Sequence, residues 1–270
     1  MIVRDEFKDS ICNLIKGGLI IEVTTEEEAI IAEQAGAKAI VVVDWDEQLK
    51  ETGFMPDIYI IEQIKASVSI PIFVRIVSGQ FVEAKLVEKL QLAGIDEVVA
   101  ASNNTSLYKR TFSIPFINEY DNFETAIHQM VQGSVMIKNK DNSCIHTIAS
   151  QLNNLRRQVK YLTTLTEEEI AEEANNRNSH LDMLLHIRES ELPALLVAHG
   201  LIRNPTEVAF LMRSGADALM IKYSVFKEMK VERLLKTLVE AVNQYENDEE
   251  ILRLQKSISP LNEKACVYKR

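Results

Sequence analysis

The sequence predicts an α/β protein of the (β/α)8 TIM-barrel class. Eight short apolar segments with strand character alternate with helical patterns along the whole chain. Glycines join helix to strand at four of the junctions, at Gly36, Gly94, Gly133 and Gly215. Strands separated by helices pair in parallel through right-handed crossovers, and eight of them can close into a ring.

A doubly wound open sheet is the competing architecture. It usually carries a glycine-rich phosphate-binding turn after its first strand. The corresponding segment here, from Glu22 to Thr25, contains no glycine. The pattern therefore favours the closed barrel, with extra helices after the sixth strand and at the C-terminus.

The expected elements follow from the apolar runs and from helix-start signals. Helices begin where a capping residue precedes acids or proline, as at Thr24-Thr25, Thr166 and Asn204-Pro205. The predicted strands are 19–23, 39–43, 71–77, 95–99, 114–117, 134–138, 193–198 and 215–221. The predicted helical stretches are 7–16, 24–35, 57–68, 81–92, 122–132, 144–189 with a restart at 166–169, 204 onward, and 231–257.

The length of 270 residues allows one large α/β domain or two small ones. We expect a single domain over residues 1–270, with an N-terminal helical segment at 1–17 and a C-terminal helical extension at 231–270. A 46% apolar content is ample for one continuous core. The formal net charge of −10 argues against nucleic-acid binding and against attachment to an anionic membrane. No apolar run approaches the roughly 20 residues that span a bilayer.

Cysteine usage indicates a reducing compartment. The three cysteines are scattered and lack metal-ligand spacing. Cys144 and His146 have no evident third ligand, so no metal site is expected. With no signal-peptide core after Met1, we expect a cytoplasmic protein.

In such a barrel the ligand site lies at the C-terminal ends of the strands. The polar or otherwise notable residues at those positions are Glu22, Asp44, Arg75, Val99, Lys138, Lys140, His199 and Lys222. Arg75 stands out because an always-charged guanidinium inside an apolar strand needs a partner, a bound anion or water. It is either a structural arginine paired with a carboxylate or a residue aimed into a ligand site.

Several segments together resemble the PdxS/SNZ family, the synthase subunit of pyridoxal 5'-phosphate synthase. Gly-Gly-Leu-Ile-Ile-Glu-Val at 17–23, Gly-Gln-Phe-Val-Glu-Ala at 79–84 and Met-Ile-Lys-Asn-Lys at 136–140 carry the resemblance. Ala-Glu-Gln-Ala-Gly-Ala at 32–37, Ser-Ile-Pro at 69–71 and Gly-Ala-Asp at 215–217 with Val-Phe-Lys at 225–227 add to it. The resemblance covers nearly the whole chain, in order.

This resemblance implies a (β/α)8 barrel that assembles into hexameric or dodecameric rings and docks a glutaminase that supplies ammonia. The family builds pyridoxal phosphate from a pentose 5-phosphate, a triose phosphate and that ammonia, and no bound cofactor is implied. One lysine on strand three forms an imine with the pentose phosphate, and a second on strand six receives the intermediate. Aspartates on strands one and four assist, and glycine-rich loops hold phosphate.

Carried over by position, the family's strand-three lysine falls on Arg75, its strand-one aspartate on Glu22 and its strand-four aspartate on Val99. Lys140 alone matches a catalytic lysine. The phosphate loop after strand six becomes 141–146 and lacks glycine. The remaining candidates for a degenerate site for a small anion or sugar phosphate are Lys138, Gly200, Lys222 and Ser224.

Physical chemistry shows why Arg75 matters. Imine formation needs a neutral amine, and the pKa of a lysine can be lowered toward neutrality by burial or neighbouring charge. Freeing a guanidinium at neutral pH would cost roughly 7 kcal/mol. We therefore expect a divergent member that has lost synthase activity and serves as a non-catalytic partner of an active subunit, in a homo- or hetero-oligomer. The rival is an active enzyme, lyase or aldolase-like or a pyridoxal phosphate synthase, that uses Lys140 as its Schiff-base residue on a sugar phosphate. Arg75 would then bind an anion and Glu22 would act as acid or base.

Overall fold

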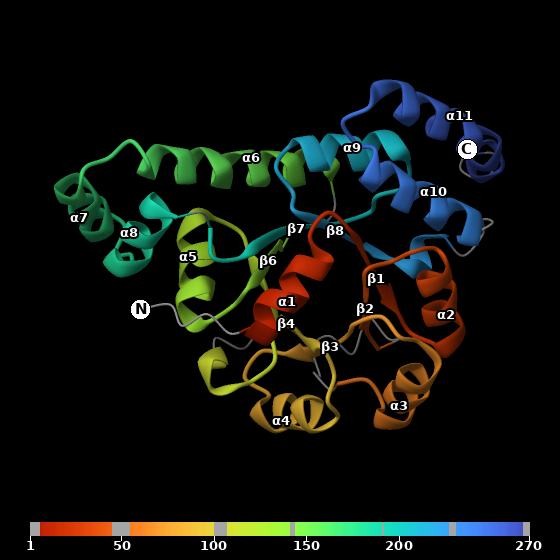
Figure 1. Cartoon of the computed structure of the whole chain (residues 1–270), viewed down its shortest axis with the longest axis horizontal. Helices are drawn as coiled ribbons and strands as arrows, with labels where there is room; N and C mark the ends of the chain where they lie inside the picture. Colours follow the sequence, from red (N-terminus) through yellow and green to blue (C-terminus); the bar gives the residue numbers. More distant parts are fainter. Residues whose placement is uncertain are drawn as a thin grey trace.

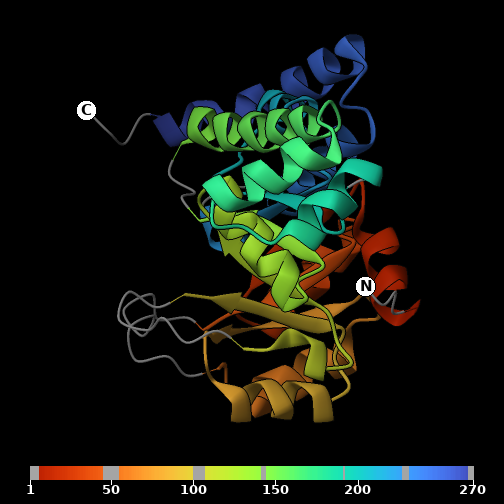
Figure 2. The same cartoon turned by 90° about the vertical axis from the view of Figure 1, so that its left-hand side faces the viewer.

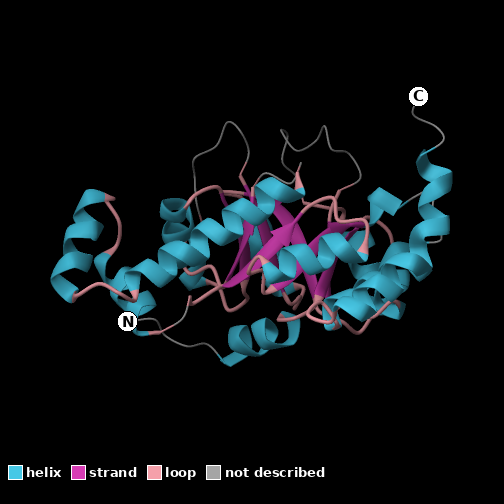
Figure 3. Ribbon diagram, turned by 90° about the horizontal axis from the view of Figure 1, so that it is seen from above, coloured by secondary structure: helices cyan, strands magenta, loops and turns pink. Residues whose placement is uncertain are grey.

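The computed structural model of the chain describes residues 6–44, 55–99, 107–140, 144–190, 192–226 and 231–266. Eight parallel strands close into a barrel in sequence order, β1 to β8, which confirms the predicted fold. Figure 1 views this barrel with the strands at its centre, and Figure 3 shows the helices surrounding them. The strands are β1 (Leu19–Val23), β2 (Ala39–Val42), β3 (Ile72–Val77), β4 (Gly94–Val98), β5 (Phe116–Tyr120), β6 (Met136–Asn139), β7 (Leu195–His199) and β8 (Ala218–Lys222).

Helices connect most successive strands, as the alternation predicts. The connection from β4 to β5 differs, because its described part carries the short 3-10 helix η2 instead of an α-helix. The helices are α1 (Glu6–Ile15), α2 (Glu26–Gln34), α3 (Ile58–Ser67), α4 (Phe81–Lys89), η2 (Lys109–Thr111), α5 (Phe123–Gln132), α6 (Ile145–Leu162), α7 (Glu167–Asn176), α8 (Leu181–Glu189), α9 (Pro205–Arg213), η3 (Tyr223–Phe226), α10 (Val231–Asn243) and α11 (Asp248–Cys266).

The later strands run further toward the C-terminal end of the barrel than their apolar runs indicate. β5 begins two residues later than predicted, after Pro115, because proline has no backbone N–H to donate to a sheet. β6, β7 and β8 end on the polar residues Asn139, His199 and Lys222, each one residue past the predicted end of its strand. Pairing with neighbouring strands extends them, so polar side chains reach the mouth of the barrel.

Two separate cores hold the fold together. Residues from alternate strand positions fill the barrel interior, among them Ile20, Val41, Phe73 and Met220. The opposite faces of the strands pack against the helices in a larger outer core. This division follows from the two-residue period of a strand, which sends successive side chains to opposite faces.

Helix α1 closes the N-terminal end of the barrel. Its Ile15 is fully buried and packs with the interior core. Gly17 N–H donates to Asp217 O at 2.7 Å, and Leu219 N–H donates to Gly18 O at 3.1 Å. Figure 1 shows α1 crossing this end of the strands. The opposite end of the barrel is therefore the one available to a ligand.

The predicted extra helices are present after β6 and at the C-terminus. The long helical stretch after β6 divides into α6, α7 and α8, and α7 and α8 lie at the far left of Figure 1. The predicted restart is the capping box of α7, in which Thr166 and Glu169 exchange side chain and backbone hydrogen bonds. In Figure 2 the C-terminal helices α10 and α11, in blue, lie in the upper part of the view, along the outside of the barrel. In the described part of the chain, no helix is long and apolar enough to cross a membrane.

Candidate functional site at the barrel mouth

A charged layer lies inside the barrel directly above its apolar interior. It consists of Glu22 on β1, Arg75 on β3, Asp96 on β4, Lys138 on β6 and His199 on β7. We call these five residues the mouth cluster. Four are buried, and Arg75 keeps 14% of its side chain exposed. Alternation along each strand places them on the same inward face as the interior core.

Arg75 is held by two carboxylates. Its Nε and Nη2 donate to Asp96 Oδ2 at 2.8 and 2.6 Å, and Nη2 also donates to Glu22 Oε1 at 2.5 Å. Asp96 is within reach because it is the direct register partner of Arg75 across the β3–β4 pair. The strand-end arginine is thus paired with a carboxylate, as the structural reading of the sequence supposed, and with two of them.

Asp96 also holds Lys138. The Lys138 Nζ lies 2.7 Å from Asp96 Oδ1 and donates to Oδ2 at 2.8 Å, and both side chains are fully buried. One carboxylate therefore bridges two cations. Removing it would leave a buried ammonium without this carboxylate, which is a strongly destabilising change.

His199 completes the cluster from the other side of Glu22. Its Nε2 lies 2.7 Å from Glu22 Oε1, and the side chain is 5% exposed. Its buried Nδ1 has no hydrogen-bond partner within the described ranges. The backbone of this residue is fixed by Asn139, whose side chain accepts from His199 N–H and donates to His199 O, both at 2.8 Å.

The pKa shifts agree with these pairings. Burial alone would raise the pKa of Glu22, but Arg75 and His199 hold that pKa well below its ordinary value. Burial likewise opposes ionisation of Asp96, and the charges of Lys138 and Arg75 outweigh it, so the pKa of Asp96 is lowered. Burial is also the main reason that the pKa of His199 is lowered. Two carboxylates, two cations and a neutral imidazole give the cluster no net charge.

The remaining predicted site residues lie near the mouth cluster but do not belong to it. Lys140 is exposed, just beyond β6, and the structure gives its side chain no hydrogen bond or ion pair to a described residue. The backbone N–H of Gly200 donates to Met220 O at 3.2 Å and is thus already engaged. Lys222 is half-buried beside Glu22 in the β1–β8 register, and Ser224 is exposed in η3.

Two further positions that the sequence singled out, Val99 and Asp44, are exposed and lie outside the mouth cluster. Val99, on which the family's strand-four aspartate falls, lies one residue past β4 and is 36% exposed. Asp44 is exposed after β2. The segments 45–54 and 141–143 lie outside the described residues, and the second is half of the loop expected at 141–146.

Asp96 is the site residue that sequence reasoning missed. The signal was present, because Asp96 follows Gly94 at the two-residue spacing that puts both on the inward face of β4. The carboxylate that Arg75 requires could have been sought on the adjacent strand. Choosing Asp96 over its neighbour Glu97 depends on the β3–β4 register, which the linear sequence does not state.

Fold and site together define a parallel (β/α)8 barrel whose mouth is filled by an ion-paired cluster. Among solved structures, thiamine phosphate pyrophosphorylase from Pyrococcus furiosus matches with a TM-score of 0.55 at 12% identity, over 87% of this chain and 98% of that one. FabK from Thermotoga maritima matches with a TM-score of 0.51 at 12% identity, over 83% of this chain and 62% of that one. At such identities these similarities show the barrel fold alone.

The sequence comparisons are more specific, and they show that the chain belongs to the SOR/SNZ family, whose model matches residues 4–198. The pyridoxal 5'-phosphate synthase subunit PdxS of Caldanaerobacter subterraneus is 32% identical over 91% of this chain and 88% of its own length. The PdxS subunit of Shouchella clausii is 30% identical over 96% and 91%, and that of Methanosarcina mazei is 29% identical over 93% and 87%. The chain is thus similar to PdxS subunits over nearly its whole length.

Proposed function

We propose that this protein is a non-catalytic, PdxS-like subunit that acts as a structural or regulatory partner of an active pyridoxal 5'-phosphate synthase subunit in vitamin B6 biosynthesis. The observation that carries the proposal is the Arg75 guanidinium, held by Glu22 and Asp96 where the family pattern has its imine-forming lysine. A guanidinium stays protonated at any physiological pH and does not supply the neutral amine that an imine requires.

The rest of the mouth cluster supports the same conclusion. Lys138 is fully buried and its ammonium is bound to Asp96, so it offers no free amine. Gly200 N–H and the Arg75 Nε and Nη2 groups are engaged within the protein. A sugar phosphate would therefore find these donors already occupied, by Met220 O in the case of Gly200 and by carboxylates in the case of Arg75.

Similarity to proteins named as synthase subunits supports the partner role. The matching relatives span nearly the whole chain, so the similarity covers the whole barrel and not a fragment of it. The proposed partners are active family subunits in a ring assembly, with their glutaminase as a further candidate. A non-catalytic copy in such a ring would alter the number of active sites without changing its architecture.

Co-expression tests this proposal. The tagged protein is produced with an active synthase subunit from the same organism and with an unrelated (β/α)8 barrel as the control. We expect the active synthase subunit to co-purify with the tagged protein, and the control barrel not to. The active subunit and the tagged protein should elute together as one large ring in size-exclusion chromatography. A tagged chain that stays outside the rings, under conditions where the active subunit assembles, contradicts the partner role.

The second candidate function is a Schiff-base lyase or aldolase that uses Lys140. The observation that favours it is that the Lys140 side chain is exposed at the strand-six position where the family has its second lysine, and no ion pair to a described residue occupies it. Arg75 and Glu22 are less suited to assist, because they bind one another.

Borohydride trapping separates the two functions. The protein is incubated with a pentose 5-phosphate or a triose phosphate, reduced, and measured by intact mass, with Lys140→Arg as the matched control. The non-catalytic proposal expects no adduct in either protein. An adduct formed by the wild type and absent from Lys140→Arg would establish the enzymatic alternative.

A further inference from the structure

A second buried polar cluster lies on the outer face of the barrel wall, between β4, β5 and the helical layer. It contains Ser78, Glu97, Lys109, Asn118, Gln129 and Ser134, which we call the outer cluster. Nothing in the mouth cluster uses these residues. Elsewhere in this layer the outward strand positions are mostly apolar and pack on helices, and Asn139 is polar but uncharged. A charged pair here therefore requires an explanation.

Glu97 is the centre of the outer cluster. Its Oε2 lies 3.1 Å from Lys109 Nζ and accepts from Asn118 Nδ2 at 2.7 Å, and its Oε1 accepts from Ser78 Oγ at 3.0 Å. Lys109 also donates to Gln129 Oε1 at 3.1 Å. The Lys109 side chain is fully buried and that of Glu97 is 1% exposed. Burying such a pair is costly unless its geometry and hydrogen bonds are good.

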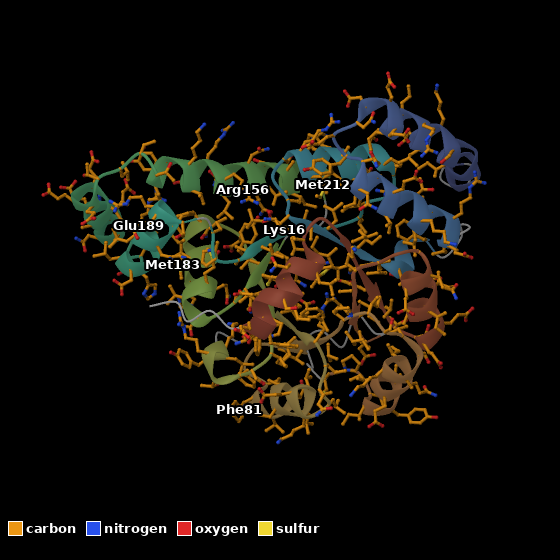
Figure 4. The ribbon with its side chains drawn as sticks, in the orientation of Figure 1. Lys16, Phe81, Arg156, Met183, Glu189 and Met212 are labelled. Atoms are coloured by element: carbon orange, nitrogen blue, oxygen red, sulfur yellow. The ribbon has the colours of Figure 1, made fainter. Side chains whose placement is uncertain are left out.

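Lys109 lies at the place where the helical layer is incomplete. It begins η2 in the β4–β5 connection, whose described part has no α-helix. Apolar contacts flank it, since Phe112 meets Phe81 of α4 and Phe116 of β5 at ring distances of 5.8 and 5.3 Å. Phe81 itself lies at the outer edge of α4 (Figure 4). Aromatic contacts of Phe112 on the outer side and the Lys109–Glu97 ion pair beneath therefore hold this segment against the barrel.

Neighbouring elements converge on the same segment. Lys8 of α1 donates to Phe112 O at 2.8 Å, and Glu88 of α4 accepts from Ser113 N–H at 2.7 Å. Arg110 Nε donates to Val131 O of α5 at 3.2 Å. Together these contacts connect η2 to α1 at the base of the barrel, to α4 and to α5.

The outer cluster is also adjacent to the mouth cluster through β4. Glu97 follows Asp96 directly, and strand alternation sends Glu97 outward to Lys109 and Asp96 inward to Arg75. A shift of β4 that moved one carboxylate would move the other, because both belong to the same short strand.

We propose that Lys109 is a positioning residue: its buried pair with Glu97 docks residues 107–115 against the barrel wall, where this described part of the connection has no α-helix, and so holds β4 where Asp96 meets Arg75 and Lys138. This inference does not depend on whether the protein is catalytic. It predicts that losing Lys109 loosens one segment and disturbs the mouth cluster, while the far side of the barrel is unaffected.

The charge of Lys109 provides a second, independent readout. Burial lowers the pKa of Lys109, and Glu97 opposes that shift by raising it. The other charged or titratable groups around the segment are His128 on α5, Arg110 on η2, Lys85 and Glu88 on α4 and Lys8 on α1. In Glu97→Gln the ammonium loses its carboxylate, so the folded state binds this proton less well than the unfolded state. Stability of that variant should then rise with pH toward the unfolded lysine value of about 10.4, more than in the wild type.

The experiment compares Lys109→Met, Glu97→Gln and the double variant with Lys236→Met, which removes an exposed pair with Glu232 on α10. Hydrogen exchange followed by mass spectrometry reports on residues 107–117, and the NMR resonance of Arg75 Nε–H reports on its bond to Asp96. We expect Lys109→Met to speed exchange in that segment at least tenfold, to shift the Arg75 resonance, and to lower the melting temperature by about 10 °C.

The other variants make the outcome decisive. The double variant should recover much of the lost protection, because it removes the unpaired buried carboxylate, and Lys236→Met should change neither readout. Exchange in residues 107–117 within about twofold of the wild type, or an unmoved Arg75 resonance, would overturn the inference. If Lys109→Met does not fold, the absence of extra pH dependence in Glu97→Gln would overturn it instead.

Discussion

Arg75 and Asp96 face each other directly across the β3–β4 pair, and two nitrogens of the Arg75 guanidinium donate to the single Asp96 Oδ2 at 2.8 and 2.6 Å. Lys138 binds the same carboxylate from across the barrel, at 2.7 Å from Oδ1. Asp96 is therefore the common partner of both buried cations. The ion pairs of the mouth cluster therefore depend on this residue as much as on Arg75.

Replacing Arg75 by methionine should destabilise the protein by about 3–5 kcal/mol. The change leaves Glu22 and Asp96 buried without the cation that binds them both. Urea denaturation measures the loss, and Arg253→Met is the control because its ion pairs with Glu240 and Glu250 are exposed. A loss for Arg75→Met no larger than that for the control would contradict the pairing described here.

Stability should fall as the pH drops from 7 toward 5, partly because of His199. The pKa of His199 is lowered in the folded protein, whereas an unfolded histidine keeps a value near 6.5. The unfolded state therefore gains the proton first, and folding becomes less favourable through this range. Melting temperatures against pH should show a shallower fall for His199→Gln than for the wild type. The exposed His146→Gln serves as the control and should keep the wild-type slope.

A further loss of stability should appear below about pH 4 from the two carboxylates of the mouth cluster. The pKa values of Glu22 and Asp96 are lowered on folding, so their contribution is complete above their unfolded values and disappears as the pH falls through the folded ones. Acid titration followed by circular dichroism measures it. An Asp96→Asn variant that retained the full acid-induced loss would show that other groups cause it.

Replacing Lys140 by alanine should change the free energy of unfolding by less than about 0.5 kcal/mol. Its side chain is exposed and makes no ion pair with a described residue. The contrast with Lys138 is the useful comparison, because Lys138→Ala removes a fully buried partner of Asp96. Equal effects of the two variants in urea denaturation would mean that the mouth cluster contributes little to stability.

Replacing Thr166 by alanine should cost about 1 kcal/mol by removing the N-terminal cap of α7. The Thr166 side chain accepts from Glu169 N–H at 3.3 Å, and the Glu169 carboxylate accepts in return from Thr166 N–H at 2.8 Å. Thr163→Ala, just after α6, is the matched control because its hydroxyl donates to Lys160 O and caps no helix start. Thermal unfolding of both variants checks the difference, and equal melting temperatures would argue against the capping role.

The barrel could be predicted from the sequence because its determinants are local. Apolar runs, helix caps such as Thr25 and Asn204, and glycines at helix ends each act within a few residues. Gly133 shows the last point, since it adopts a left-handed φ of 105° where α5 ends. Strand ends were less predictable, because the last residues of β6, β7 and β8 are polar and belong to the sheet only through their neighbours.

The sequence by itself determined that this is a (β/α)8 chain of the PdxS/SNZ type with an arginine, Arg75, inside its third strand. Only the tertiary structure decided what that arginine does. Register places Asp96 beside Arg75, and closure of the barrel brings Lys138 and His199 to the same layer from strands far apart in the chain. Strand order and burial bring two carboxylates and two cations together in one neutral cluster. No local pattern in the sequence encodes that arrangement.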